Sequence, residues 1–310
     1  MVILLTAIGK RIELIEHLKS RATVIGADCS ELNPARYFTD KFYQVPRIND
    51  PEYLEILLSI CEENKADYLI PLMEPEFELL SANRERFNKI ATKLLLSDTN
   101  IIRLCKNKAD TDAFFKKYGI PSPKTYKEEE ITESQYPLVI KPADGMGSEN
   151  VYVVSSTEDY MCALKKVKNP IIQEKLEGTE YTMDVLCGEN GEIIYIVPRV
   201  RLEVRAGEVS KSRVELRDDV TDITKRVMEA LKKEGNIMGP FTLQCFLCND
   251  GTVRMLEINP RFGGGVPLAF ASGADYAAAL EDILRKKAPV PNPIKPKTML
   301  RYDRSIFIDN

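Results

Sequence analysis

Hydrophobic and polar positions alternate in regular blocks along the first hundred residues. Short apolar runs of strand length occupy residues 2–6, 23–26 and 68–71, and amphipathic helical patterns occupy residues 11–20 and 51–64. An acidic loop then leads from the third strand into a further helix. Because strands that alternate with helices are typical of a parallel sheet, residues 1–100 are predicted to form an α/β domain.

The pattern changes after residue 100. Residues 107–120 predict a helix, since Asn107 is a suitable N-cap, Gly119 suits the C-terminus and Pro121 prevents continuation. Two short strands, at residues 136–142 and 151–154, then enclose a glycine-containing loop. Glycine lets the backbone approach a ligand closely, so this loop is either a plain hairpin connection or one that lays N–H groups over phosphates.

Hairpins dominate the rest of the chain. Residues 170–180 form a linker, after which strands 181–187 and 192–197 are joined at Asn190-Gly191, a favoured turn pair. A second hairpin crosses Asp250-Gly251. Further elements are expected beside them: helices at residues 220–234 and 274–287, a proline-rich connector at 288–296 and a last strand at 299–308.

The second hairpin gathers oxygen-bearing side chains. With Asp250-Gly251 as a two-residue loop, Asn249 pairs with Thr252, and counting outward places Gln244 opposite Glu257, with Cβ atoms about 4.5–5.5 Å apart. Mg²⁺ selects carboxylate and amide oxygens of this kind. The residues expected on one face are Gln244, Phe246 and Cys248 of the first strand, and Met255, Glu257, Asn259 and Arg261 of the second.

Charged side chains alternate sharply with apolar ones in residues 199–205. The two predicted faces are Arg199, Arg201, Glu203 and Arg205 on one side, and Val200, Leu202 and Val204 on the other. A solvated strand face is the more common fate of such charges. A cation cluster in an acidic chain is also a natural place for an anionic substrate, so both interpretations stay open.

Composition describes an ordinary globular chain. Its 310 residues have room for about two domains, and a formal net charge of −4 gives no reason to expect nucleic acid. No apolar run reaches the ~18 residues of a membrane span, and residues 2–5 are too few for a signal-peptide core. We therefore expect a cytoplasmic protein that binds neither nucleic acid nor membranes.

Cysteine and histidine usage narrows the chemistry. Seven scattered cysteines fit reduced thiols, and Cys245 and Cys248, three apart on a strand, should point to opposite faces. His17, the single histidine, is expected on a solvated helix face, which argues against histidine-dependent catalysis. Gly9 and Asp28 follow the first two strands without a G-x-G-x-x-G motif, so an NAD-dependent oxidoreductase has little support.

An ordered set of short motifs runs through residues 108–261. It comprises Lys108 at the start of a helix ending KKYGIP, VIKP before the glycine loop, QEKLEGTEYT, and Gln244 followed by Glu257-Ile-Asn259-Pro-Arg261. In this order the motifs resemble the ATP-grasp superfamily, and are most similar to members related to the large subunit of carbamoyl-phosphate synthase.

The resemblance covers nearly the whole chain and implies its architecture. An α/β, Rossmann-like pre-ATP-grasp domain (1–100) would precede a two-lobed, α+β ATP-grasp domain (101–310). The small ATP-lid lobe would span about residues 110–175, and the central antiparallel sheet lobe about residues 176–310.

The resemblance also implies a site for ATP and Mg²⁺, with Mn²⁺ as an alternative metal. Phosphate contacts would be Lys108, Lys141, Met146, Gly147 and Ser148. Nucleoside contacts would be Glu174, Lys175 and Leu176 at the adenine and Glu180 at the ribose. Metal ligands would be Gln244, Glu257 and Asn259. Contacts to the transferred phosphoryl group would be Arg261 and Lys211.

The implied chemistry joins a small carboxylate to an amine. The carboxylate attacks the γ-phosphate of ATP, and an amine, or less often a thiol, then displaces phosphate from the acyl phosphate. A carbamoyl-phosphate synthase large subunit has two such halves and this chain has one, so a free-standing carboxylate–amine ligase is expected. The alternative is a non-catalytic nucleotide-binding or regulatory subunit of a carbamoyl-phosphate synthase-like system. A homodimer is among the assemblies that the sequence leaves open.

Overall fold

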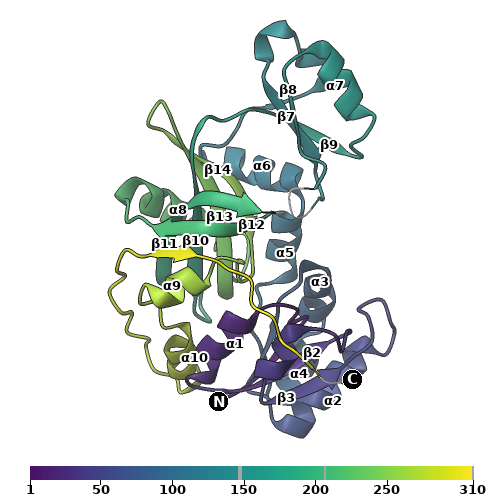
Figure 1. The fold of residues 1–310 in the computed structure, drawn as a ribbon, viewed down its shortest axis with the longest axis vertical. Helices are drawn as coiled ribbons and strands as arrows, with labels where there is room; N and C mark the ends of the chain where they lie inside the picture. The colour runs from purple at the N-terminus through teal and green to yellow at the C-terminus, as the bar shows by residue number, and fades with distance from the viewer. Residues whose placement is uncertain (146–148, 206, 309–310) are drawn as a thin grey trace.

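The computed structural model describes residues 1–145, 149–205 and 207–308, which form three sheets with helices around them (Figure 1). The first sheet is parallel with strand order β3-β2-β1-β4-β5, as the α/β prediction requires. Its strands are β1 (Val2–Thr6), β2 (Thr23–Asp28), β3 (Lys41–Gln44), β4 (Tyr68–Pro71) and β5 (Lys93–Leu94). Its helices are α1 (Ile12–Lys19), α2 (Tyr53–Asn64), α3 (Glu74–Ala82) and α4 (Arg84–Lys89), with a 3-10 helix at Pro34–Phe38.

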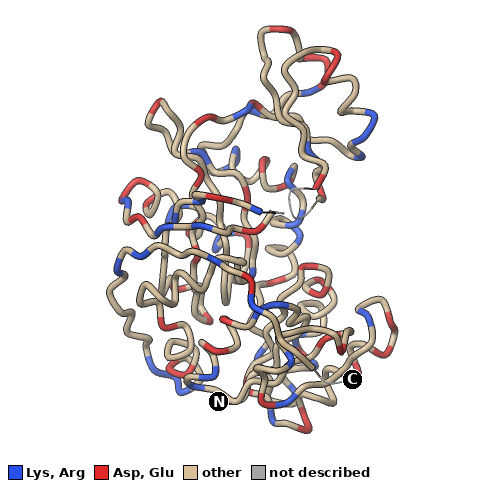
Figure 2. Tube along the Cα trace, viewed as in Figure 1, with Lys and Arg blue, Asp and Glu red and all other residues tan. Residues whose placement is uncertain are grey.

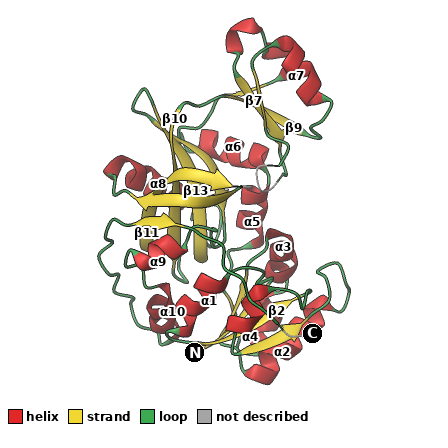
Figure 3. Cartoon of the chain, in the orientation of Figure 1, coloured by secondary structure: helices red, strands yellow, loops and turns green. Residues whose placement is uncertain are grey.

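Strand β1 contributes to two different hydrophobic cores. Ile3 and Leu5 are fully buried on the face that meets α1 and residues from the far end of the chain, whereas Leu4 is buried on the face covered by α2 and α3. Successive side chains of a strand point to opposite faces, so a continuous apolar run is what a sheet covered on both sides needs. Figure 3 shows helices on both sides of this sheet.

The second sheet is antiparallel and forms the centre of the molecule, with strand order β14-β13-β10-β11-β12-β15. Its strands are β10 (Gly178–Cys187), β11 (Ile193–Arg205), β12 (Glu208–Val214), β13 (Gly239–Cys248), β14 (Val253–Asn259) and β15 (Thr298–Leu300). The helices beside it are α5 (Thr99–Lys106), α6 (Lys108–Lys117), α8 (Asp218–Leu231), α9 (Pro267–Ala271) and α10 (Tyr276–Leu284).

Strand alternation divides the central sheet into an apolar and a polar face. Tyr181, Met183 and Leu243 are buried in a core with α5, α6 and α8. Their neighbours Glu180 and Gln244 must then point to the other side of the sheet. That side packs on the first domain at one end and carries polar side chains at the other.

The third sheet forms a small lobe that projects from the body (Figure 1). Its order is β6-β9-β7-β8, and it has a small core of its own. Its elements are β6 (Thr125–Tyr126), β7 (Leu138–Pro142), β8 (Tyr152–Val154), β9 (Pro170–Glu174), α7 (Thr157–Leu164) and two 3-10 helices, Glu128–Glu130 and Glu133–Gln135. Residues 170–180, expected to be a linker, instead hold β9 and the start of β10.

Helix α6 belongs with the central sheet rather than with the small lobe. Its N-cap is Asn107, as predicted, whose side chain accepts from the N–H groups of Ala109 at 2.8 Å and Asp110 at 3.4 Å. Phe114 and Phe115 are buried in the core of the central sheet. The small sheet therefore begins after this helix, later than the expected boundary near residue 110.

The C-terminal strand is shorter than predicted. Only Thr298–Leu300 pairs with β12, and residues 301–308 carry no strand. In Figure 1 the yellow trace after β15 passes from the central sheet to the first domain. Arg301 lies at the start of this stretch, with its Nη2 3.5 Å from Glu13 Oε2 of α1.

The prediction for His17 was wrong. Its ring stacks on Phe270 with centroids 3.8 Å apart, and its Nε2 accepts a hydrogen bond from the N–H of Ala277 at 3.3 Å. Helices α9 and α10, distant in sequence, cover this face of α1. Because helical periodicity reports only a helix's own apolar side, it gave no sign of this cover.

Acidic and basic residues are interspersed along the whole trace rather than gathered in one segment (Figure 2). No helix in the described part of the chain is long and apolar enough to cross a membrane.

Candidate functional site

A cleft of about 530 Å³ lies where the small lobe meets the central sheet. The predicted site residues that line it come from both lobes: Lys108, Lys141, Glu174, Lys175, Leu176, Glu180, Gln244, Glu257, Asn259 and Arg261. Met146, Gly147 and Ser148 lie outside the described residues, but Gly145 and Glu149 on either side of them line the cleft.

The hairpin of β13 and β14 supplies a carboxylate and two amides to the cleft. Gln244 pairs directly with Glu257, as predicted, and its Nε2 donates to Glu257 Oε1 at 2.5 Å. Asn259 Nδ2 donates to the same oxygen at 3.0 Å. An amide turned by half a rotation presents its oxygen in place of its N–H group, so this donor set fits a hard cation such as Mg²⁺.

The amides are essential to that set. Among the residues with described positions, no group of three or more histidine, cysteine, aspartate and glutamate side chains could hold a metal. A site here would combine one carboxylate with two neutral oxygens, and Mg²⁺ would complete its shell with water and with phosphate oxygens of a ligand.

The loop of this hairpin differs from the prediction. Cys248 N–H donates to the carbonyl of Thr252 at 2.8 Å, so the loop holds three residues, 249–251, and the predicted Asn249–Thr252 pair was wrong. Gly251 has a φ of +81°. A three-residue loop that ends in a left-handed residue is a common hairpin connection.

A register shift further along compensates for the longer loop. Gln244 pairs with Glu257 but Cys245 pairs with Met255, so Leu256 is the extra residue of a β-bulge. Met255 is consequently fully buried in the core. Leu256 lines the cleft instead, on the face where Met255 was expected. The register at the metal-type residues was right although the loop was not.

The cysteines agree with the prediction of reduced thiols. Cys245 and Cys248 are both buried and both free. Phe246 lines the cleft, whereas Cys248, expected on the same face, does not belong to its lining.

Two lysines bring positive charge into the cleft. Lys108 Nζ donates to the carbonyl of Gly145 at 2.5 Å, at the start of the glycine loop. Burial lowers the pKa of Lys141, Glu257 opposes that effect, and Lys108 adds to it. The two ammonium groups and the Glu257 carboxylate therefore lie within electrostatic range of one another, an arrangement suited to a metal–polyphosphate ligand.

Arg201 bridges Glu180 and Gln244 on the polar face of the central sheet. Its Nη1 donates to Glu180 Oε1 at 2.9 Å and to Gln244 Oε1 at 3.0 Å. Burial raises the pKa of Glu180, and the Arg201 guanidinium opposes that rise. The sequence left open whether Arg201 lies on a solvated face or binds an anionic substrate, and its signal was its place among the alternating charges of residues 199–205.

The predicted charged face of residues 199–205 is divided among different environments. Arg199 is buried, Arg201 lines the cleft, and Glu203 pairs with Lys211. Register shifts on both sides of Glu203 interrupt the alternation. As a result Val204, expected on the opposite face, lines the cleft.

Lys211 is not brought into the cleft. Its Nζ lies 2.8 Å from Glu203 Oε2, and half of its side chain is exposed. The structure thus gives Lys211 a surface ion pair, and it does not belong to the described lining of the cleft.

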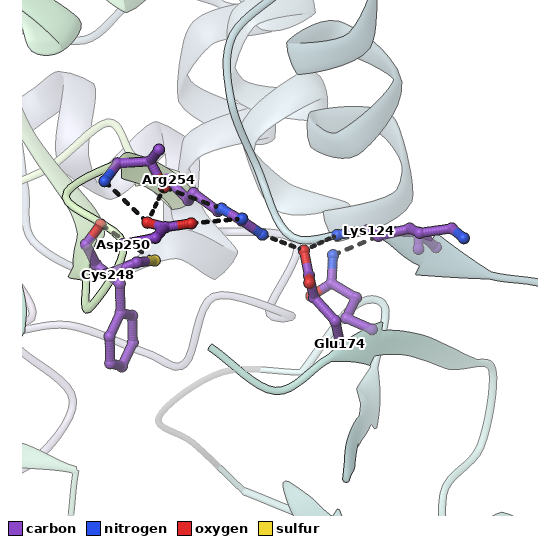
Figure 4. Close-up of polar contacts among 9 residues, drawn as sticks. Lys124, Glu174, Cys248, Asp250 and Arg254 are labelled. Carbon is purple, nitrogen blue, oxygen red and sulfur yellow. Dashed lines mark hydrogen bonds and ion pairs between the residues drawn. The ribbon is translucent and has the colours of Figure 1, made fainter. Parts of the chain in front are cut away.

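Glu174 is held by its neighbours where the small lobe joins the body (Figure 4). Its Oε1 accepts from Arg254 Nη1 at 2.6 Å and from Lys124 N–H at 2.7 Å. Arg254 Nη2 also lies 3.3 Å from Asp250 Oδ2. The Glu174 carboxylate therefore ties β9 to the β13–β14 hairpin and fixes the backbone that follows it, where Leu176 N–H has no acceptor among the described residues.

Arg261 connects the cleft with the first domain. Its Nε donates to Glu74 Oε1 at 2.9 Å, and Glu74, in the first turn of α3, lines the cleft as well. The sequence placed Glu74 in an acidic loop without assigning it to the site. The sequence offered little indication that Glu74 belongs to the site, because nothing in it specifies how the two domains pack.

Two family matches separate the first domain from the part of the chain that holds the small sheet and most of the central sheet. Residues 105–265 match the family described as ATP-grasp domain, and residues 3–95 match the family described as PylC-like, N-terminal domain. The chain belongs to the ATP-grasp family. The matched segment of this ATP-grasp protein contains Lys108, Lys141, the carboxylate–amide set and Arg261. The resemblance and the fold class inferred from the sequence are thereby confirmed.

Curated relatives of this ATP-grasp chain carry several names. It is 26% identical over 160 residues to a D-alanine--D-alanine ligase of Fusobacterium nucleatum, covering 49% of this chain and 55% of that protein. It is 24% identical over 168 residues to a carbamoyl-phosphate synthase of Methanobrevibacter smithii, covering 51% and 44%. The chain thus spans about half the length of the curated relatives it matches.

Solved structures share the ATP-grasp fold over nearly the whole chain. The N5-carboxyaminoimidazole synthetase from Staphylococcus aureus complexed with ADP superposes with a TM-score of 0.76 at 18% identity, covering 97% of this chain and 82% of that one. At that identity the likeness establishes the fold.

Proposed function

We propose that this protein is an ATP- and Mg²⁺-dependent ligase that activates a small-molecule carboxylate as an acyl phosphate and joins it to an amine. One observation carries the proposal. The hydrogen-bonded set of Gln244, Glu257 and Asn259 shares a single cleft with Lys108 and Lys141. Metal-type oxygens and two ammonium groups are what the triphosphate of a nucleotide requires.

Each cleft residue has a role in this proposal. Lys108, Lys141 and residues 146–148 would contact the phosphates of ATP. The Lys175–Leu176 backbone would hydrogen-bond the adenine, which the unsatisfied N–H of Leu176 supports, and Glu180 would hold the ribose. Gln244, Glu257 and Asn259 would hold Mg²⁺, which supplies positive charge at the phosphate oxygens when bound.

The reaction follows from the charges rather than from a nucleophilic side chain. A substrate carboxylate oxygen attacks the γ-phosphorus, the bond to the β-phosphate oxygen breaks, and ADP leaves. Lys141 and Arg261 stabilise negative charge on the phosphoryl group and hold the reactants in line. An amine nitrogen then attacks the acyl carbon, inorganic phosphate leaves, and the nitrogen loses a proton.

The names of relatives agree with this reaction class. D-alanine--D-alanine ligase and carbamoyl-phosphate synthase both name products in which an acyl carbon is joined to nitrogen or phosphate. A non-catalytic nucleotide-binding subunit is the less favoured alternative, because such a subunit has no need of Glu257, Asn259 and Arg261 together in the cleft.

The setting of the enzyme is also part of the proposal. A cytoplasmic location is supported by seven cysteines that all remain free thiols. Mn²⁺ is an alternative to Mg²⁺, since oxygen ligands accept both. Small carboxylate and amine substrates would be its partners. A homodimer stays a prediction, which sedimentation velocity can test.

Nucleotide binding provides the first test. Because a ligand that binds only the folded state stabilises it, ATP with Mg²⁺ should raise the melting temperature, by the equivalent of about 2.7 kcal/mol at a hundred times its Kd. A melting temperature that does not respond to millimolar MgATP would contradict the proposal.

The metal-type carboxylate provides the second test. We expect Glu257→Gln to abolish ADP release, measured over paired carboxylates and amines, while the melting temperature without ligand stays close to that of the unsubstituted protein. Glu203→Gln, which changes a carboxylate of the same sheet outside the cleft, is the matched control and should keep turnover. Equal turnover in both variants would remove Glu257 from the mechanism.

A further inference from the structure

The turn Gly263–Gly265 follows Arg261 and meets the first domain, and its three glycines have different surroundings. A Cβ atom on Gly263 would lie 2.8 Å from Thr242 Oγ1, and one on Gly265 would lie 2.5 Å from the guanidinium carbon of Arg199. Close packing therefore requires glycine at both positions. A Cβ atom on Gly264 would instead meet Arg11 Nη1 at 3.5 Å and the Glu208 carboxyl carbon at 3.7 Å, which are ordinary contacts.

Three arginines from separate parts of the chain gather around Gly264. Arg301 Nη2 donates to the carbonyl of Gly264, and Arg261 lies three residues before it. Arg11 comes from the N-cap position of α1 in the first domain. Burial lowers the pKa of Arg11, Arg261 and Arg301 lower it further, and Glu208 opposes them.

Arg11 differs from the other two in its contacts. Arg261 Nε lies 2.9 Å from Glu74 Oε1. Arg301 Nη2 lies 3.5 Å from Glu13 Oε2, and Arg301 Nη1 lies 3.6 Å from Glu208 Oε2. Within the described residues, the Arg11 guanidinium makes no hydrogen bond and has no carboxylate within 4.0 Å. It is half-buried, so a small molecule can still reach it.

The carboxylates of the cluster are paired with Arg261 and Arg301, which leaves the half-buried Arg11 guanidinium as the group that an added anion can join. It presents five N–H donors in a planar fork, the geometry that binds a carboxylate or phosphate through two parallel hydrogen bonds. The N–H of Gly264 also lacks an acceptor among the described residues, which adds a backbone donor at the same place.

We propose that Arg11, with Arg261, Arg301 and the Gly264 N–H, binds an anionic group, carboxylate or phosphate, of the non-nucleotide substrate. Arg11, Gly264 and Arg301 do not line the nucleotide cleft, whereas Arg261 does. The anion site is therefore separate from the one proposed for ATP and adjoins it through Arg261. This inference rests on the proposed function, because it makes Arg261 the link between the phosphoryl group and the substrate.

The consequence is a substrate class. A reactant without a second charged group would leave Arg11 unpaired, so acids or amines that carry an additional carboxylate or phosphate are preferred. Arg11 would be a specificity-determining residue, supplied by the first domain to a reaction catalysed in the second.

The test titrates two simple anions into the protein saturated with Mg²⁺ and a non-hydrolysable ATP analogue. Malonate represents a carboxylate and inorganic phosphate represents a phosphate ester, and the melting temperature is followed with each. We expect one of the two to stabilise the unsubstituted protein. Arg11→Met should raise the anion concentration needed for half the effect about tenfold or more, since a charge-assisted hydrogen bond is lost.

The matched control is Arg21→Gln, at an exposed arginine just after the same helix, which should respond like the unsubstituted protein. Gly264→Ala is a second variant that leaves Arg11 in place and narrows the site, and it should weaken the anion response as well. The anion that acts identifies the group that the substrate carries.

An unchanged anion response in Arg11→Met would overturn the inference. So would the absence of any response to both anions in a protein that does respond to the nucleotide. A missing nucleotide response would instead contradict the proposed function, and the same anion titration without nucleotide would then still decide the role of Arg11.

Discussion

Asp184 and Arg199 form an ion pair that is almost wholly removed from water beneath the glycine turn. Arg199 Nε donates to Asp184 Oδ2 at 2.7 Å, and the two residues are 2% and 1% exposed. A buried charge that loses its counter-charge keeps its desolvation penalty. We therefore expect Asp184→Asn to lower the free energy of unfolding by about 3–5 kcal/mol, measured by urea denaturation.

An exposed ion pair of similar length is the control for that measurement. Arg86 lies 2.7 Å from Glu55, and both side chains are well solvated. Removing such a pair with Glu55→Gln should leave the free energy of unfolding almost unchanged. If Asp184→Asn cost no more than this control, the Asp184–Arg199 pair would not be what supports the glycine turn.

At the level of secondary-structure elements, the β13–β14 hairpin shows what the sequence could and could not predict. Residue types and alternation were enough to predict the direct pairing of Gln244 with Glu257 and hence the composition of the carboxylate–amide set. They could not reveal the bulge at Leu256, because strict alternation assumes a ladder without extra residues. The additional loop residue and the bulge offset each other, so the pairing of Gln244 with Glu257 was right and the faces of Met255 and Leu256 were not.

The same limit applies to β11. Alternation predicted one charged face, and register shifts around Glu203 divided it between the core, the cleft and the surface. Arg201 precedes these shifts and keeps its predicted face, and it becomes a cleft residue through its contacts with Glu180 and Gln244, which are distant in sequence. Contacts of that kind depend on strand order, and strand order is not encoded in local periodicity.

The hairpin loop offers a test of its own. Gly251 has a φ of +81°, and a Cβ atom added to it would have no neighbouring atom within 4 Å, so an alanine there suffers only backbone strain. We expect Gly251→Ala to cost about 1–2 kcal/mol of stability. The melting temperature should fall, while the KM for ATP stays unchanged because the loop is outside the cleft.

Asparagine tolerates left-handed backbone better than alanine, so Gly251→Asn is the control and should retain more of the stability. Equal losses in the two variants would mean that the cost arises from something other than the left-handed conformation.

At the scale of the whole molecule, His17 joins the first domain to the last helices. It stacks on Phe270 and accepts from the N–H of Ala277, which requires an unprotonated Nε2. Burial lowers the pKa of His17 from its ordinary value of 6.5, and Asp275 opposes that effect. The unfolded chain therefore takes up a proton first as the pH falls, and stability is lost from about pH 6.5 downward.

We expect His17→Gln to lose less stability than the unsubstituted protein between about pH 7.5 and pH 5.5, measured by urea denaturation at each pH. The comparison between the two proteins is needed because burial raises the pKa of Glu76 to about 7. Between pH 4.5, its ordinary pKa, and pH 7, the Glu76 carboxyl contributes stability that is lost as the pH rises. The effect of His17 has the opposite sign, because its contribution is lost as the pH falls. Parallel pH profiles for the two proteins would exclude His17 as the source.

The shared core of the first domain has a consequence for how the protein is made. Ile3 and Leu5 leave the ribosome well before Tyr276 and Leu280, which cover the same core and follow about 270 residues later. At about 5–20 residues per second, that face of the first sheet stays open to water for tens of seconds during synthesis. The parallel sheet can form early, but this face can be sealed only after α10 has been made, so the nascent chain is a natural client for chaperones until then.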